Sequence, residues 1–352
     1  MVRTLMVALA ALAWILASPA AAKSHLFDDG APPLKIVLTA ALPDLVRNDR
    51  TNPKPYPATL TVTDGDTSAE TLAIQLSARG LTRRTAGFCS FPPLLLSFDK
   101  AARGALFKGQ KKLKLVTYCR TPPDYEQRIV LEYLAYKLYN LMTPMSFKVR
   151  AAEVTYRTGE SDPGLTRFGY LIEDVKDLAD RNDRDKLALT THQISARQLD
   201  PHAAARAALF EFMVSNLDWE FLAAPPGVEC CHNARLLAAH DATPATASAV
   251  APVPYDFDFS GLVDSPYAST PAALPVESVT ERYYRGYCVS NGEVASVVQE
   301  YQARRADMMA VINGEPRLNA EFRSRALKFL DGFFAILDDP ERVQRQIIAH
   351  CR

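Results

Sequence analysis

The chain has 352 residues, of which 40 are acidic and 40 are basic. Its length allows one large domain or two modest ones. Because the charges balance and no basic stripe or block of like charge occurs, the composition argues against nucleic acid as a partner.

The first 22 residues have the layout of a secretory signal peptide. Arg3 gives a positive start, Leu5–Leu16 form a short apolar run, and Ser18–Ala22 are small residues suited to cleavage. The apolar run is shorter than the roughly 20 residues that a membrane span requires. We therefore expect residues 1–22 to be removed and the rest to be exported, to the periplasm or outside the cell, with no membrane span. An uncleaved N-terminal anchor is the alternative.

The first half of the mature chain is predicted to be mainly β-structure. Alternating apolar and polar residues, rich in β-branched types and separated by Gly and Asp, predict an antiparallel sheet. The predicted strands cover residues 34–42, 58–64, 71–80, 94–98 and 112–119. Two more are predicted at 147–157 and 167–175.

One helix interrupts these strands. Apolar residues recur at helical spacing from Asp124 to Met142, and Asp124 follows two prolines, which makes it the predicted N-cap. Residues 176–200 are polar and predict helix with loops. The alanine-rich stretch at 202–217 predicts another helix, whereas the low-complexity residues 241–252 indicate a surface insertion.

The C-terminal sixty residues predict two or three amphipathic helices, the last one starting at Asp339-Pro340-Glu341. The order of elements favours an α+β fold with two lobes. The first lobe would be β-rich and cover residues 23–175 with one helix, and the second would be helical and cover residues 176–352. A cleft between two lobes is the expected place for a ligand.

The six cysteines suit disulfides in an oxidising compartment and form no CxxC pairs, which disfavours structural zinc. Cys89 and Cys119 flank a predicted pair of strands and could bridge them. Either Cys230 or Cys231 could reach Cys288, but the spacing leaves the connectivity open.

Three short stretches of the second half place oxygen-bearing side chains at the edges of apolar segments. "VSNLDWE" contains Asp218, "CCHNARLL" contains Asn233, and "VPYDFDFSGL" contains Asp256 and Asp258. Carboxylate and amide oxygens suit Mg²⁺ bound together with substrate phosphates. An aspartate that accepts a hydroxyl proton, a metal-binding asparagine and a later metal-binding aspartate make up the phosphoryl-transfer set of kinases.

In this order, "SNLDW", "HNARLL" and "PYDFDFSGL" resemble the catalytic core of the CotH-type spore coat kinases. "GQKKLKLVTYC…DYEQRIVLEYLAYKLYN" resembles the strand and lobe helix of that family, and "RFGYLIEDV" resembles the strand that leads into its hinge. The resemblance spans roughly residues 75–265. It implies an atypical, two-lobed protein-kinase-like fold and phosphate transfer from ATP to a protein hydroxyl, with Mg²⁺ or Mn²⁺. The implied partners are a nucleotide and a protein substrate.

The resemblance also implies roles for individual residues. Asp218 would be the catalytic aspartate that orients or deprotonates the acceptor hydroxyl, and Asn233 would hold a metal beside it. Asp256 would bridge the metal to the phosphates, and Asp258 would support the loop or reach a second metal. Glu132, on the lobe helix, would pair with a lysine that anchors the phosphates.

The nucleotide side of the site departs from the family. The strand "FPPLLLSF" lacks the expected lysine, so Lys112 and Lys114 on the next strand are the substitutes, on one face of that strand. Glu173, at the end of "RFGYLIEDV", is assigned to the same nucleotide site. No GxGxxG or Walker-type loop is present. Gly80 and Gly87, on either side of Arg83-Arg84, are the nearest replacement.

The sequence also leaves other hypotheses about function open besides the kinase. A catalytically silent relative would be a binding or structural protein of the cell envelope that keeps the scaffold. A metal site formed by Cys230, Cys231, His232 and His240 matches no common zinc spacing. A Ser-His-Asp hydrolase is weaker still, because no GxSxG elbow is present.

Overall fold

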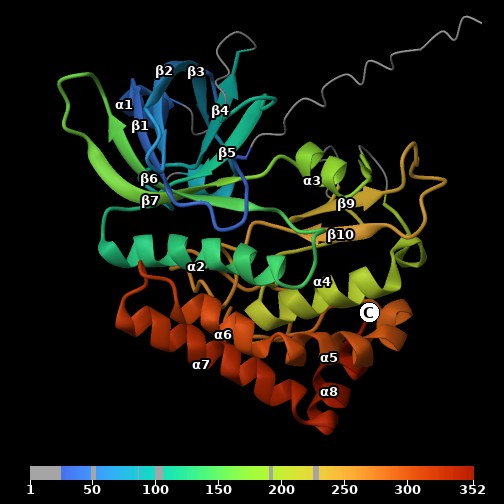
Figure 1. The fold of residues 1–352 in the computed structure, drawn as a ribbon. Coiled ribbons are helices and arrows are strands. Elements are labelled where there is room, and N and C mark those ends of the chain that lie inside the picture. Colours follow the sequence, from blue (N-terminus) through green and yellow to red (C-terminus); the bar gives the residue numbers. More distant parts are fainter. Residues whose placement is uncertain (1–24, 49–52, 86, 100–105, 190–192, 225–229) are drawn as a thin grey trace, which may run out of the picture.

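The computed structural model describes residues 25–48, 53–85, 87–99, 106–189, 193–224 and 230–352. The predicted signal peptide, residues 1–22, lies outside this part of the chain. Seven strands of the N-terminal half close into a barrel in the order β1-β2-β3-β4-β5-β7-β6 (Figure 1). These strands are β1 (Leu34–Ala40), β2 (Tyr56–Asp64), β3 (Glu70–Ala78), β4 (Leu94–Phe98), β5 (Lys112–Val116), β6 (Val149–Arg157) and β7 (Leu165–Ile172).

The predicted two-lobed, protein-kinase-like fold is wrong. The barrel closes because β1 pairs in parallel with β6, whereas the other neighbouring strands are antiparallel. A second, three-stranded sheet of order β10-β9-β8 stands apart from it. This sheet consists of β8 (Asp185–Lys186), β9 (Ala234–Ala238) and β10 (Ala251–Pro254). Strands are therefore not confined to the first half, and they form no single antiparallel sheet.

The alternation of side chains explains the barrel. In β3, the inward-facing Leu72, Ile74 and Leu76 are buried, and the residues between them are exposed. In β7 the buried residues are consecutive, because Leu171 fills the barrel whereas Tyr170 packs on the helical side. A strand covered on both faces is expected to be apolar throughout.

Eight helices lie in the described residues. They are α1 (Leu42–Asn48), α2 (Pro123–Asn140), α3 (Val175–Arg181), α4 (Pro201–Val214), α5 (Val294–Ala303), α6 (Arg305–Asn313), α7 (Ala320–Leu337) and α8 (Pro340–Gln346). The last sixty residues thus hold four helices rather than two or three. Asp339 caps α8 as predicted, but α2 is preceded by Pro122, so Asp124 lies in its first turn and is not its N-cap.

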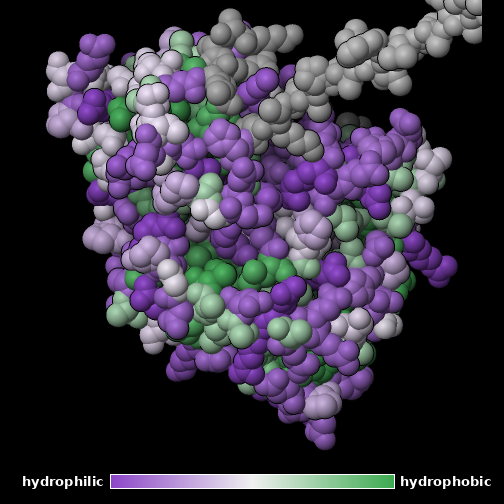
Figure 2. Space-filling model, in the orientation of Figure 1, coloured by the Kyte–Doolittle hydropathy of each residue, from purple (hydrophilic) through white to green (hydrophobic). Residues whose placement is uncertain are grey.

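Helix α2 lies between the barrel and the C-terminal helices (Figure 1). Its buried face, including Val130 and Leu134, belongs to the same hydrophobic cluster as α4 and α7, whereas the barrel interior forms a separate cluster. Hydrophilic residues cover most of the face in Figure 2, and hydrophobic ones gather at the level of α2. The predicted division between residues 175 and 176 stays a prediction.

Three cysteine pairs lie at disulfide distance. Cys89–Cys119 is the predicted bridge and is confirmed. The predicted pairing of Cys230 or Cys231 with Cys288 is wrong. Cys230 pairs with Cys231, and Cys288 pairs with Cys351. The backbone N–H of Cys288 donates to the carbonyl of Arg352, which brings the chain end to this cysteine. Within the described residues, no helix has both the length and the apolar character needed to cross a membrane.

Candidate active site

A cavity of about 430 Å³ gathers five of the predicted site residues. Its walls come from the β3–β4 connection, from β4 and β5, and from the segments around α4, β9 and β10. The predicted residues in the wall are Lys114, Asp218, Asn233, Asp256 and Asp258. Their neighbours in the wall include Arg79, Arg83, His232, Arg235 and Tyr255. The volume lies in the usual range of small-molecule sites, about 300–1,000 Å³.

Asp218 is placed by the end of α4. Ser215 ends this helix in the left-handed conformation, with φ 52°, and its hydroxyl donates to the carbonyls of Val279 and Glu281. The chain then turns, and the side-chain oxygen of Asn216 accepts the backbone N–H of Asp218 at 3.1 Å. These contacts bring the Asp218 carboxylate to the cavity wall.

The carboxylate of Asp218 is held on both sides. Nε2 of His232 lies 2.7 Å from its Oδ1, and the side-chain amide of Asn233 donates to its Oδ2 at 3.0 Å. The Asp218 hydrogen bond raises the pKa of His232 above its ordinary value, against the opposing effect of burial. Asp218 therefore has a fixed orientation and a neighbour that gains positive charge easily.

Asn233 stands just before β9, also in the left-handed conformation, with φ 50°. Asn and Asp tolerate this conformation better than most residues. Its amide nitrogen binds both the carbonyl and the carboxylate of Asp218. Since the nitrogen is engaged there, the amide oxygen is left for another ligand, and no described residue donates to it.

Asp256 follows the end of β10 at Pro254 and is likewise left-handed, with φ 68°. Its backbone N–H donates to the hydroxyl of Tyr136 at 2.9 Å, which fixes it against α2. Among the described residues, none bonds or pairs with its carboxylate. A polar group kept in a sparsely populated conformation without a partner is typical of binding sites.

Three cations face the same cavity. Lys114 and Arg235 both lie against the ring of Tyr255, at 4.7 and 4.5 Å from its centroid, and Arg79 lies in the wall beside them. None of the three pairs with a carboxylate in the described part of the chain. Burial, reinforced by the charges of Arg79 and Arg235, lowers the pKa of Lys114 to about 7. An anionic ligand would relieve this repulsion.

Arg83 lies in the cavity wall and contacts two carboxylates. Its guanidinium donates to Glu132 on α2 and to Asp258 at 3.0 Å, and the hydroxyl of Tyr267 donates to Asp258 as well. All three charged side chains are buried. Burial raises the pKa of Asp258 to about 7, because the single guanidinium also serves Glu132 and cannot offset the loss of water around both carboxylates. Those two carboxylates in turn keep the pKa of Arg83 high in spite of its burial.

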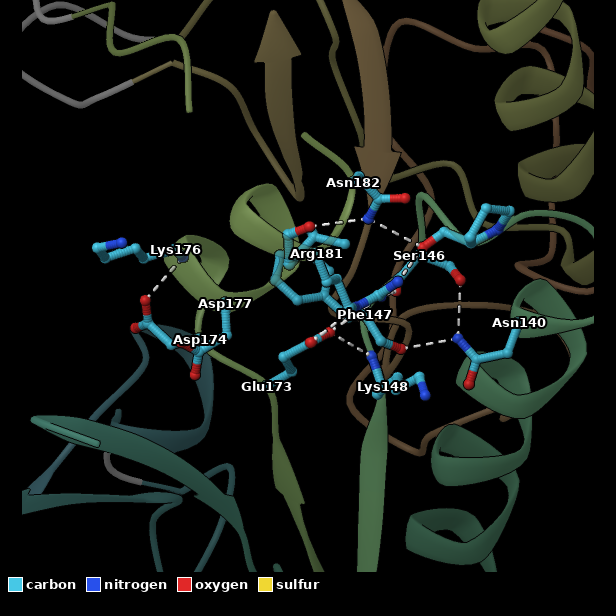
Figure 3. A network of polar contacts seen from close by, with 12 residues as sticks. Asn140, Ser146, Phe147, Lys148, Glu173, Asp174, Lys176, Asp177, Arg181 and Asn182 are labelled. Carbon is cyan, nitrogen blue, oxygen red and sulfur yellow. Dashed lines mark hydrogen bonds and ion pairs between the residues drawn. The ribbon is translucent and has the colours of Figure 1, made fainter. Parts of the chain in front are cut away.

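Three predicted residues, Lys112, Glu132 and Glu173, lie outside the cavity wall. Lys112 is exposed on β5 and does not line the cavity, although it shares a face of the strand with Lys114. Glu173 is buried in another polar network (Figure 3), where it accepts from Arg181 at 2.8 Å and from the backbone N–H of Lys148 at 3.0 Å. Burial raises the pKa of Glu173 despite these donors. Its partners are structural, since they join α3 to the start of β6.

Glu132 also has a partner other than the predicted one. It pairs with Arg83, and no pairing with Lys112 or Lys114 is found among the described residues. Sequence reasoning missed Arg83, Arg79 and Arg235 as parts of the site. The only available signal was the position of Arg83 between Gly80 and Gly87, because nothing in the sequence relates that loop to α2.

The donor set fits a hard divalent cation. The amide oxygen of Asn233 and the carboxylate of Asp256 face one cavity without protein partners among the described residues, and such oxygens are the ligands that Mg²⁺ prefers. Mg²⁺ usually takes only one or two carboxylates and completes its shell with water and phosphate. Within the described residues, no group of three His, Cys, Asp or Glu side chains is suited to a metal. The cysteines and histidines of the alternative zinc site belong to the described residues, and they form no such group.

No protein-family model matches the chain, and no curated protein matches its sequence.

Proposed function

We propose that this protein is an exported phosphotransferase that moves the terminal phosphoryl group of ATP, with a divalent metal, to the hydroxyl of a protein substrate. One observation carries the proposal. Asp218, Asn233 and Asp256 come from three separate segments and line one cavity together with Lys114, which pairs with no carboxylate among the described residues. A proton acceptor, metal-suited oxygens and phosphate-suited cations are the parts that phosphoryl transfer needs.

The motifs that resemble CotH-type kinases also support this reaction. The resemblance assigns the catalytic role to Asp218 and the metal to Asn233 and Asp256, which are residues of this cavity wall. Export is supported by the three cysteine pairs at disulfide distance, since such pairs are typical of oxidising compartments.

The residues of the chain divide the work as follows. Lys114, Arg79 and Arg235 bind phosphate oxygens and orient the nucleotide. Asn233 and Asp256 would hold Mg²⁺, which supplies positive charge against the phosphates. Asp218 accepts the hydroxyl proton as the acceptor oxygen forms its bond to phosphorus. The bond from phosphorus to the bridging oxygen breaks, and the nucleoside diphosphate leaves with that electron pair.

The binding part of the proposal is tested by thermal unfolding with Mg²⁺ alone, ATP alone and both together. We expect a rise in Tm only with both, and its loss in Asp256→Asn. Asp66→Asn is the matched control, because it removes an exposed aspartate from the turn between β2 and β3, at the opposite end of β3 from the cavity. The absence of any Mg²⁺-dependent rise in the wild type would overturn the proposal.

The transfer part is tested with ATP labelled in the γ-phosphate. We expect the label to appear on a hydroxyl of a protein acceptor, or slowly in water, and to stay in ATP when Asp218 is replaced by Asn. Nucleotide binding without any loss of label from ATP would instead support the silent binding protein. That outcome would leave the cavity as a nucleotide site but exclude the transferase.

A further inference from the structure

A buried acidic side chain lies beneath the turn that carries Asp218. Glu211, on α4, is fully buried, and neither oxygen of its carboxyl group has a hydrogen-bond partner in the described residues. It takes no part in the cavity wall or in the reaction proposed above. A buried carboxyl without a partner is costly, so its presence calls for a physical reason.

The side-chain amide of Asn216, close to Glu211, is a buried donor that lacks an acceptor among the described residues. Asn216 is 1% exposed. The two side chains lie close enough for Asn216 to lower the pKa of Glu211, although their approach falls short of ordinary hydrogen-bond geometry. A small rotation would join the amide of Asn216 to the carboxyl of Glu211 and satisfy both groups.

The same amide is bound to the catalytic turn through its other end. The oxygen of Asn216 accepts the backbone N–H of Asp218, and the backbone N–H of Asn216 donates to the carbonyl of Glu211 at 2.8 Å. Arg285 holds the turn from outside, with hydrogen bonds to the carbonyls of Leu217 and Trp219. The orientation of the Asn216 amide therefore sets the position of the Asp218 backbone.

We propose that Glu211 is a positioning residue, whose uncharged carboxyl orients Asn216 and through it the turn that presents Asp218. The charged groups around it are few. Burial raises its pKa well above the ordinary value and the charge of Asp218 adds to this effect, whereas Arg285 acts in the opposite direction. The inference rests on the proposed function for its kinetic consequence, but the state of the carboxyl and of the amide can be measured without any activity.

Two variants separate positioning from simple packing. Glu211→Gln keeps an uncharged group able to accept from Asn216, so we expect kcat close to that of the wild type. Glu211→Leu removes the acceptor and also removes a buried acid, so we expect Tm equal to or above the wild-type value and kcat lower by about tenfold or more, with KM for ATP unchanged. Glu160→Gln, in the exposed loop between β6 and β7, is the control for loss of an acidic residue.

The direct readouts are spectroscopic. Infrared difference spectra should contain the C=O band of a protonated carboxyl at neutral pH that is missing in Glu211→Gln. The side-chain NH₂ signals of Asn216 should be protected from exchange in the wild type and Glu211→Gln, and exposed in Glu211→Leu. The inference would be overturned if Glu211 were ionised at neutral pH. It would also be overturned if the exchange protection of the Asn216 NH₂ signals were the same in the wild type and in both variants. If the wild type transfers no phosphate, the proposed function fails, whereas these spectra still decide the role of Glu211.

Discussion

The side-chain nitrogen of Asn233 lies 3.0 Å from Oδ2 of Asp218, across fifteen positions of sequence. Since His232 holds the other carboxylate oxygen at 2.7 Å, the aspartate has one orientation in the cavity. The same bond turns the amide oxygen of Asn233 away from Asp218. One contact therefore orients both the expected proton acceptor and one expected metal ligand.

Replacing Asp218 by Asn should affect the rate and leave nucleotide binding intact. The amide has the size of the carboxylate but accepts no proton, and general bases of this kind contribute about 10²–10⁴-fold to the rate. We expect the single-turnover rate of phosphate transfer to fall by that factor, while the Mg²⁺-dependent rise in Tm with ATP stays. A variant that transfers phosphate at the wild-type rate would remove Asp218 from the mechanism. Asp66→Asn again serves as the control.

Replacing Arg83 by Met should destabilise the fold strongly. Glu132 and Asp258 would then be buried without their cation, and loss of one partner of a buried ion pair typically costs about 3–5 kcal/mol. The free energy of unfolding, measured in urea, checks this value. The double variant Arg83→Met/Glu132→Gln should recover part of the loss, because it removes one of the stranded charges. A cost below about 1 kcal/mol, the range of exposed pairs, would contradict the buried network.

The sequence predicted the individual strands and helices better than it predicted the closure of the strands into a barrel. Alternation in β1 and β3 and the helical period of α2 depend on neighbouring residues, so these elements appear close to where they were expected. The parallel pairing of β1 with β6 joins strands more than a hundred residues apart, and alternation carries no information on which strands meet. For this reason the barrel was missed and a two-lobed fold was predicted instead.

The candidate site likewise contains residues that the sequence predicted and residues that it could not predict. Asp218, Asn233 and Asp256 each lie at the edge of an apolar segment, and they line one cavity. The cation opposite Glu132 depends on where the β3–β4 connection folds, so Arg83 could not be predicted. Nor does the sequence near Glu173 indicate that Arg181, at the end of α3, covers its carboxylate.

Asp258 should make stability depend on pH. Its folded-state pKa is raised to about 7 by burial, so between about pH 4 and about pH 7 the folded protein holds a proton that the unfolded chain has released. The contribution of this group is therefore greatest in acid and is lost as the pH rises through about 7. Urea unfolding at several pH values should give a slope in this interval that Asp258→Asn lacks. Equal slopes in both proteins would mean that Asp258 is ionised throughout.

Lys114 should take up a proton when the nucleotide binds. Its pKa of about 7 in the free protein means that the ammonium is largely deprotonated at about pH 8, and phosphate oxygens nearby would raise that pKa. Titration calorimetry of ATP and Mg²⁺ in two buffers of different ionisation enthalpy measures the proton uptake. We expect uptake in the wild type and less of it in Lys114→Met, together with weaker binding. Lys112→Met, on the same strand but outside the cavity, should behave as the wild type.

The bridge between Cys89 and Cys119 should stabilise the barrel chiefly through the unfolded state. It closes a loop of 30 residues, and the chain-entropy relation assigns such a loop about 3–4 kcal/mol. The double variant Cys89→Ser/Cys119→Ser should lose stability by that amount, measured in urea without a reductant. The same two proteins in the presence of a dithiol should differ little, because the wild-type bridge is then open. If the variant equals the oxidised wild type, these two sulfurs are not joined in the native protein, and the support that this pair gives to an oxidising compartment is withdrawn.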